Sequence, residues 1–355
     1  MFDPYPFARP FLHRLDPEDA HAVTLRALEA NVVPGQPRDV DPILETTLFG
    51  RRLSNPVGLA AGFDKNGRVF ERMGTHGFGF VEVGGVTPKP QAGNPRPRVF
   101  RLPEDGAVIN RMGFPNGGAE VLEGRLRAKR RPDDLGLGIN LASNADSADP
   151  AADFVALASR FAPYADYLTL DVSCPNTVNG LEFLDPERLA DLLARLAAIA
   201  WPVRPALVAK LSPDIDDSLL QRMVAVLLEA RIDGIIVANT TRARPPLRSS
   251  YAREAGGLSG LPLFARSTAM LARVRELAGP ALMLIGVGGI TSGADAYAKI
   301  RAGATAVQLY TGLVYGGTAL VTRIKRELGA LLRRDGFAGV AEAAGAGTSA
   351  SPAVL

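Results

Sequence analysis

The stretch LTLDVSCPNT, residues 168–177, ends an apolar run in a polar loop that holds the only cysteine of the chain, Cys174. A lone cysteine cannot form an internal disulfide, so its thiol is either a small hydrophobic group or a reactive one. The proline and asparagine that follow it indicate a loop rather than a core helix. We therefore interpret Cys174 as a candidate acid or base, with a buried, inert thiol as the alternative.

Two lysines occupy positions where a cation could meet a ligand. Lys210 closes the apolar run ALVAK, and a buried lysine there is costly unless it meets an anion or an electron-rich ring. Lys65 follows an earlier apolar run, in AGFDKNG, and by spacing alone it fits an exposed loop lysine equally well. Both are candidates for contact with a bound ligand.

Asparagines recur at the ends of apolar runs or in the loops nearby. One planar amide offers both donor and acceptor groups, so a ring of asparagines suits a flat heterocycle with alternating N–H and C=O groups. Each one alone is more typical of a turn. They are Asn110, Asn140, Asn176 and Asn239.

The three histidines of the chain show no spacing typical of metal ligands. His13, His21 and His76 also lie away from the ends of the apolar runs. The sequence therefore predicts neither a hydrolytic metal site nor a Ser-His-Asp triad.

Eight short apolar runs alternate with helix-like stretches such as PERLADLLARLAAIA. Near-continuous apolar strands need helices on their outside, which predicts an α/β fold of the (β/α)₈ TIM-barrel type. A doubly wound open sheet is the alternative, although no GxGxxG follows the first run. Chemistry in such barrels lies where the strands end. The runs end near Gly62, Gly84, Asn140, Asp171, Lys210, Asn239, Gly286 and Tyr310.

Glycine clusters follow the last two predicted strands, in IGVGGI (285–290) and QLYTG (308–312). In barrels this is the usual place for a phosphate, which exposed backbone N–H groups hold without a metal. Tight turns are the alternative reading. A third cluster, GGLSG (256–260), is expected to add further donors.

The chain divides into three parts by composition. Residues 1–40 are predicted to form a helical arm, residues 41–335 the barrel, and the Gly/Ala/Ser-rich residues 336–355 a disordered tail. In the arm, LDPEDAH predicts a helix with Asp16 as N-cap and Pro17 at its first position.

Charge and hydropathy exclude some classes of partner. With 40 basic and 37 acidic residues the net charge is only +3, which does not favour nucleic acid as a partner. No apolar run approaches the roughly 18 residues of a membrane span. Without a signal-peptide pattern we expect a cytoplasmic setting.

Seven motifs occur together in a characteristic order and spacing: GLAAGFDKNG, NRMGFPN, SCPNT, ANTT, GGLSG, IGVGGI and VQLYTG. Over about residues 5–330 the chain resembles dihydroorotate dehydrogenases, the FMN enzymes of pyrimidine biosynthesis. The LDPEDAH helices resemble those of the quinone-dependent, class 2 branch. The resemblance implies oxidation of dihydroorotate to orotate on the path to UMP, with a quinone as electron acceptor. It also implies peripheral contact of the arm with the cytoplasmic side of the cell membrane.

The resemblance assigns roles residue by residue. The catalytic positions would be Cys174, Lys65 and Lys210. Cys174 would take the C5 proton of dihydroorotate while the C6 hydride passes to the flavin, and Lys210 would stabilise the reduced flavin. The residues matching the cofactor-binding positions are Ala61, Gly62, Phe63, Asp64, Lys65, Gly85, Asn140, Asp171, Lys210, Ala238, Gly260, Gly289, Tyr310 and Thr311. Those matching the substrate positions are Lys65, Asn110, Arg111, Met112, Gly113, Phe114, Asp171, Asn176, Asn239 and Thr240.

The sequence departs from the family pattern at five positions. Cys174 replaces the usual serine of the quinone-linked branch, Asp171 an asparagine, Gly85 and Ala238 hydroxyl residues, and Pro115 an asparagine. An ionised Asp171 would only accept hydrogen bonds and would lie near an anionic substrate. Either it binds protonated, or the chain acts on another pyrimidine or cyclic amide. A flavin-binding protein without turnover is the remaining alternative.

Overall fold

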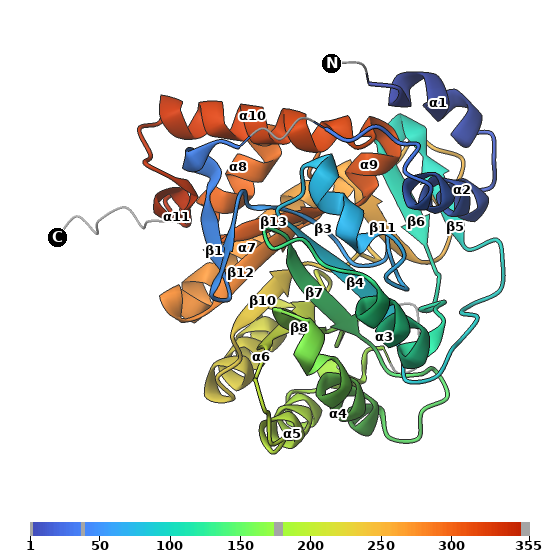
Figure 1. Cartoon of the computed structure of the whole chain (residues 1–355). Helices are drawn as coiled ribbons and strands as arrows, with labels where there is room; N and C mark the ends of the chain where they lie inside the picture. Colours follow the sequence, from blue (N-terminus) through green and yellow to red (C-terminus); the bar gives the residue numbers. More distant parts are fainter. Residues whose placement is uncertain (1–2, 37–39, 174–179, 349–355) are drawn as a thin grey trace.

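Eight parallel strands close into a barrel at the centre of the computed structural model, which describes residues 3–36, 40–173 and 180–348 (Figure 1). The strands follow the order β10-β12-β13-β3-β4-β7-β8-β9 around the barrel. The predicted (β/α)₈ barrel is therefore confirmed, and the open-sheet alternative is wrong. The barrel strands are β3 (Val57–Leu59), β4 (Phe80–Val86), β7 (Gly136–Leu141), β8 (Tyr167–Leu170), β9 (Ala206–Leu211), β10 (Gly234–Val237), β12 (Met283–Val287) and β13 (Ala306–Leu309).

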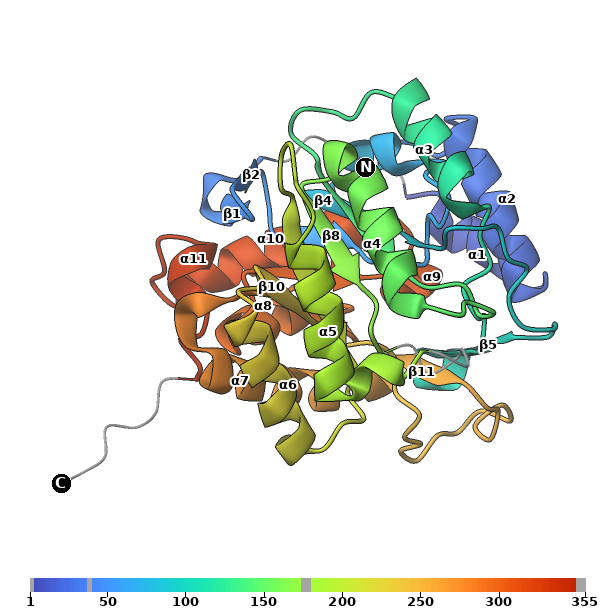
Figure 2. The same ribbon diagram turned by 90° about the horizontal axis from the view of Figure 1, so that it is seen from below.

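Among the described residues, seven α-helices connect and cover these strands, several of them prominent in the view from below (Figure 2). Helix α5 illustrates why they form: Asp185 caps its first turn by accepting the N–H of Glu187, and Pro186 occupies the first helical position. Its leucines at 189, 192, 193 and 196 are spaced three and four apart, so they share the face that packs on the barrel. The helices are α3 (Gly118–Ala128), α4 (Pro150–Phe161), α5 (Pro186–Ala197), α6 (Asp217–Glu229), α7 (Phe264–Ala278), α8 (Gly293–Arg301) and α10 (Ala319–Arg334).

Two N-terminal helices, α1 (Tyr5–Leu12) and α2 (Pro17–Glu29), lie at one side of the barrel mouth. Helix α2 contacts β5 (Val99–Leu102), and α1 contacts the short helix α9 (Thr311–Gly316) (Figure 1). Asp16 accepts the N–H of Glu18 at 2.9 Å, which confirms the predicted cap. The Tyr5 hydroxyl donates to the carbonyl of Val314 at 2.5 Å and so fixes α1 to the barrel.

A small antiparallel sheet forms a side wall of the barrel mouth. It contains β5, β6 (Ala107–Asn110) and β11 (Gly257–Gly260), with β6 in the centre. Phe100, Ile109 and Leu258 pack as its core. The long segment after β4 is thus a structured wall, and the GGLSG cluster is a strand rather than a simple loop.

The barrel interior below the mouth holds one buried carboxyl group with three donors. Glu82 accepts hydrogen bonds from Asn140 Nδ2 at 2.9 Å, Tyr167 OH at 3.0 Å and Gln308 Nε2 at 2.8 Å. Burial and the nearby Glu82 raise the pKa of Tyr167 well above its ordinary value, so this hydroxyl stays protonated and donates. Side chains therefore fill the barrel below the candidate site, as in other closed barrels of this size.

The predicted disordered tail is wrong in its first part. Residues 340–343 form a short helix, α11, in which Val340 and Ala343 are buried in the main core. Two apolar side chains three residues apart are enough to dock one helical turn, although the composition is that of a disordered segment.

None of the described helices combines the length and the apolar character needed to cross a bilayer.

Short elements complete the described chain. The remaining elements are the hairpin β1 (Thr46–Leu48) and β2 (Arg51–Leu53) and the 3₁₀ turns Pro42–Leu44, Phe70–His76, Pro103–Asp105, Ala162–Tyr164, Glu182–Leu184, Leu261–Leu263 and Gly279–Ala281.

Candidate functional site

A cavity of about 1020 Å³ lies over the C-terminal ends of the barrel strands and continues between α1 and α2. Its inner end is lined by residues such as Lys210, near the end of β9, and Asn239, just after β10. Its outer end is lined by residues such as Leu12 and Leu28. One continuous space therefore joins the barrel mouth to the N-terminal arm.

The cavity brings together most of the residues singled out from the sequence. Cys174 and Asn176 lie outside the described residues. Arg111 and Gly113 line a second cavity, on the other side of the same backbone segment. The predicted residues that line the first cavity are Ala61, Gly62, Phe63, Asp64, Lys65, Gly85, Asn110, Met112, Phe114, Asn140, Asp171, Lys210, Ala238, Asn239, Thr240, Gly260, Gly289, Tyr310 and Thr311.

Among these cavity-lining residues, Asp64 has a mainly structural role. Its carboxylate accepts the backbone N–H groups of Arg68 and Val69, each at 2.7 Å, and the side chain is fully buried. Both oxygens are therefore engaged in holding the turn that carries Lys65.

Three polar side chains meet where β8, β9 and β10 end. Asn239 Nδ2 donates to Asp171 Oδ1 at 3.1 Å, and both Asp171 and Lys210 are only 8% exposed. Burial raises the pKa of Asp171, while the charge of Lys210 opposes that rise and the charge of Glu82 adds to it. A carboxyl, an amide and an ammonium group can together bind the polar edge of a flat ring.

Gly85 has no side chain, and the aromatic ring of Phe114 lies in the space where one would be. A Cβ atom at Gly85 would lie 2.7 Å from Cδ1 of Phe114 and 3.0 Å from Oδ1 of Asn140. No described group donates to that buried Asn140 oxygen. Phe114 therefore fills the space of the missing side chain, and Asn140 keeps an acceptor available toward the cavity.

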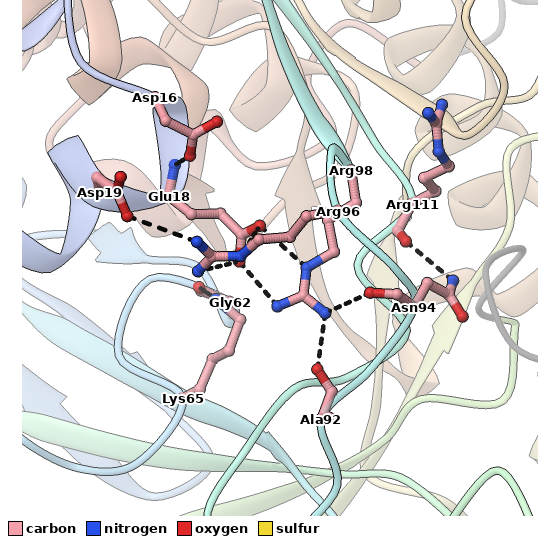
Figure 3. Close-up of polar contacts among 10 residues, drawn as sticks. All are labelled: Asp16, Glu18, Asp19, Gly62, Lys65, Ala92, Asn94, Arg96, Arg98 and Arg111. Atoms are coloured by element: carbon pink, nitrogen blue, oxygen red, sulfur yellow. Dashed lines mark hydrogen bonds and ion pairs between the residues drawn. The ribbon is translucent and has the colours of Figure 1, made fainter.

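Lys65 is half-buried at the cavity wall near charges from the N-terminal arm (Figure 3). Its Nζ donates to the carbonyl of Gly62 at 2.6 Å. Burial lowers the pKa of Lys65 to about 8, with the charge of Glu18 raising it and that of Arg98 lowering it. The lysine is thus a cation at neutral pH that can lose its proton just above it.

Glu18 also joins the arm to the wall of the second cavity (Figure 3). Arg98 donates Nε to Glu18 Oε2 at 3.0 Å and Nη2 to Oε1 at 2.8 Å. The same guanidinium donates Nη1 to the carbonyls of Ala92 and Asn94, at 2.6 and 2.7 Å. Both partners of this bidentate pair are about nine-tenths buried, so it is a fixed contact.

The glycine turn after β12 has the conformation expected of an anion cradle. Gly288 and Gly289 adopt φ of +107° and +76°, and a Cβ on Gly289 would lie 2.5 Å from that of Phe264. Behind the turn, the buried Lys299 donates Nζ to Ser267 Oγ at 2.8 Å, and Ser267 Oγ lies 3.3 Å from the carbonyl of Gly288. Burial lowers the pKa of Lys299 to about 7.

Aromatic rings separate the two ends of the cavity. His21 meets Phe63 edge-on at 5.2 Å, and Phe63 meets Tyr310 edge-on at 5.7 Å between ring centroids. Burial and the nearby Lys65 lower the pKa of His21 to about 3, so the imidazole is neutral at pH 7. Toward the arm, Arg101 donates to the carbonyls of Leu12 and His13, both at 3.1 Å.

Sequence reasoning missed four polar residues of this region. Glu18, Arg98, Arg101 and Lys299 are far apart in the chain, and only the fold brings them to the site. One partial signal was available: RPRVFRL places Arg96 and Arg98 two residues apart, which in an extended chain puts them on one side, although Arg101 does not continue this spacing.

Comparison with known proteins gives consistent matches. The family model described as dihydroorotate dehydrogenase matches residues 43–332. A Rhodospirillum rubrum protein named dihydroorotate dehydrogenase (quinone) is 51% identical over 98% of this chain and 95% of its own length. A mitochondrial dihydroorotate dehydrogenase (quinone) of Arabidopsis thaliana is 44% identical over 98% of this chain and 82% of its own. The crystal structure of DHODH from Eimeria tenella in complex with ferulenol has a TM-score of 0.90 and 36% identity, over 94% of this chain and 96% of that one.

Proposed function

The chain belongs to the dihydroorotate dehydrogenase family, and on that premise we propose that it oxidises dihydroorotate to orotate in pyrimidine biosynthesis and passes the electrons to a quinone. The observation that carries the proposal is the single cavity between the strand ends and the arm. It offers a polar compartment for a small cyclic amide and an apolar compartment for a quinone.

The residues of the inner compartment fit FMN. The left-handed Gly288–Gly289 turn can accept a phosphate group, and the unpartnered Asn140 oxygen can accept a ring N–H. Lys210 supplies a buried cation for the charge that the cofactor gains on reduction. When bound, FMN accepts a hydride from the C6 atom of dihydroorotate.

The chain's own residues would bind and deprotonate the substrate. Lys65 is the cation available for the dihydroorotate carboxylate, and Asn110, Asn239 and Thr240 offer donors and acceptors for its ring amides. We assign removal of the C5 proton to Cys174, from its place in the sequence motif SCPNT.

The outer compartment fits a neutral, hydrophobic acceptor. The exposed fractions of Phe7 and Phe11 on α1 are 67% and 69%, and Val23 on α2 is 41% exposed. These side chains can insert into the interfacial region of a bilayer, where a quinone is dissolved. We therefore assign residues 1–40 to peripheral membrane contact at the cytoplasmic face.

An anaerobic titration tests the core of this proposal. Dihydroorotate added to the oxidised yellow protein should bleach the flavin absorbance stoichiometrically. A short-chain ubiquinone analogue should then restore it faster than fumarate does. Flavin that stays oxidised with excess dihydroorotate would overturn the assignment.

A bulky side chain in the outer compartment should separate its two half-reactions. Ala8 lines the cavity from α1, so Ala8→Trp should raise the KM for the quinone about tenfold while dihydroorotate reduces the flavin at the normal rate. Arg26→Trp on the exposed side of α2 is the control, since Arg26 does not line the cavity. Equal quinone KM values in the two variants would contradict this placement, and steady-state assays with varied quinone measure them.

Glu18 should set the pH range in which the substrate anion binds. Because the charge of Glu18 raises the pKa of Lys65, Glu18→Gln should lower that pKa below its present value of about 8. Lys65 would then be neutral at a lower pH, and orotate binding at pH 8 should weaken about two- to threefold.

Asp19→Asn is the matched control for this test. Asp19 lies next to Glu18 on α2, but its ion pair with Arg96, at 3.5 Å, is solvent-exposed. Orotate dissociation constants from pH 6 to 9.5, followed by flavin absorbance, measure the effect. If binding weakens at the same pH in both variants, Glu18 does not act on Lys65.

A second candidate function follows from Asp171. Its buried carboxyl group lies where an anionic substrate must bind, which favours a neutral pyrimidine or cyclic amide as substrate. Anaerobic flavin reduction by such a neutral compound, faster than by dihydroorotate, would support this alternative.

A further inference from the structure

The second cavity, of about 940 Å³, shares a wall with the first. Along the segment that begins at Asn110, the last residue of β6, Asn110, Met112 and Phe114 line the first cavity. Arg111 and Gly113 line the second. Consecutive residues of this segment face the two cavities in turn, and Gly113 and Phe114 adopt left-handed backbone with φ of +68° and +49°. A wall one backbone thick therefore separates the second cavity from the place assigned to the substrate.

The described lining of this second cavity is strongly basic. Only two acidic side chains, Asp146 and Glu254, belong to it. Five basic side chains do: Lys89, Arg111, Arg242, Arg244 and Arg253. Since the whole chain has a net charge of only +3, this is a local concentration of positive charge.

Two of these cations are fixed in the wall. Arg111 donates to Glu254 Oε2 at 2.7 Å and to the carbonyls of Ala255 and Pro97, each at 3.0 Å. Arg244 donates to the carbonyls of Glu254 and Gly256, both at 2.7 Å. Arg244 therefore keeps its full positive charge without a carboxylate partner among these bonds.

The other three cations stand at the rim. Lys89, Arg242 and Arg253 are exposed, and the structure records no ion pair or hydrogen bond from their side chains to another described residue. Their charges are thus available to a solute at the mouth of the cavity.

The polar frame between the rim and the shared wall is rigid. Asn144 donates to the carbonyl of Lys89 and to Gln91 Oε1, both at 3.0 Å, and Gln91 Nε2 donates to the carbonyl of Gly113 at 3.0 Å. These bonds tie the rim directly to the segment that faces the substrate.

We propose that this second cavity is an anion vestibule, which captures the carboxylate of dihydroorotate and concentrates it beside the barrel mouth. The inference rests on the proposed function. Its basis is the geometry of the shared wall and the cluster of cations at the rim. Positive potential in a cleft raises the rate at which a small anion associates, and added salt weakens the effect.

The vestibule also sorts the two ligands by charge. The arm end of the first cavity is lined by apolar residues such as Phe11, Leu12 and Val23, which suit a neutral quinone. The vestibule lies on the other side of the 110–114 segment and attracts an anion. The two ligands would therefore be concentrated in separate cavities, on opposite sides of this segment.

The test is the association rate constant of orotate with the oxidised holoenzyme, followed by stopped-flow flavin absorbance. Arg242→Gln/Arg253→Gln should lower this constant about five- to tenfold at an ionic strength of about 20 mM. The difference should largely vanish at about 200 mM salt. Arg222→Gln/Arg231→Gln, which removes two exposed arginines in and just after α6, is the charge-matched control and should behave as the unmodified protein.

The outcomes separate this inference from the function on which it rests. Equal association constants in Arg242→Gln/Arg253→Gln and in the Arg222→Gln/Arg231→Gln control would overturn the vestibule, even if dihydroorotate reduces the flavin normally. Inorganic phosphate, as a competing anion, should slow orotate association with the unmodified protein at constant ionic strength, and it should have no such effect on the double variant. An unmodified protein that dihydroorotate fails to reduce would overturn the proposed function itself.

Discussion

Cys174→Ala should slow the reduction of the flavin by dihydroorotate about 10²- to 10⁴-fold, the range that a positioned general base contributes. Orotate should still bind, because the residues assigned to its carboxylate and ring amides are unchanged. The rate of anaerobic flavin reduction at saturating dihydroorotate measures the loss.

The pH dependence should identify the thiol as the base. An unperturbed thiol has a pKa of about 8.5, and only the thiolate can accept a proton. The reduction rate of the unmodified protein should therefore rise with pH through the pKa of Cys174. Cys174→Ser should retain more activity than Cys174→Ala but lose this rise, since a hydroxyl does not ionise in the range.

Two results would contradict the role of Cys174. One is a flat pH profile of the reduction step from pH 6 to 9, measured apart from reoxidation. The other is a Cys174→Ala variant whose reduction rate lies within about threefold of normal, well below the smallest effect expected of a general base.

Asp171→Asn should bind orotate about tenfold more tightly at pH 7. Two like charges about 10 Å apart repel by about 1.7 kcal/mol at an effective dielectric constant of about 20, which corresponds to slightly more than tenfold in affinity. The substitution keeps the shape of the side chain and removes the charge. It should also raise the reduction potential of the flavin, because one anion near the reduced cofactor is lost.

The sign of the pH effect follows from the shifted pKa. Burial raises the pKa of Asp171, although the charge of Lys210 limits the rise. As the pH falls toward this raised value, the carboxyl group gains a proton and repulsion of orotate disappears. The unmodified protein should therefore bind orotate more tightly at lower pH and converge with Asp171→Asn, whose affinity lacks this dependence.

A neutral ligand provides the control for Asp171. Uracil has the same ring without the carboxylate, so Asp171→Asn should change its affinity much less than that of orotate. Equal orotate affinity in both proteins at pH 7 would mean that Asp171 is already neutral there. A gain well beyond a hundredfold, with loss of activity on a neutral ring, would favour the second candidate function.

Much of the inner site could be predicted from the sequence because the residues that close each apolar run mark where a strand ends. Lys210 and Asn239 close apolar runs, and parallel strands of a barrel bring such ends to one rim. The glycine turn at 288–289 is equally local, since its left-handed backbone favours that residue.

The remaining contacts depend on packing between distant segments. Glu18 reaches Arg98 across 80 residues, and nothing in either motif specifies the other. The division of the 110–114 segment between two cavities required the position of the side sheet, which the sequence did not reveal. The docking of α11 likewise depends on a core surface built by other elements.

The alternation along residues 110–114 has an evolutionary consequence. On the proposed function, recognition of the ring and attraction of the anion would be carried by interleaved positions of one short segment, so each could change without moving the other. A mutation at Arg111 would then alter how fast a ligand arrives while Asn110 and Met112 still select which ring is accepted. Such a segment would allow a lineage to adopt a new substrate in single steps, keeping a working enzyme at each one.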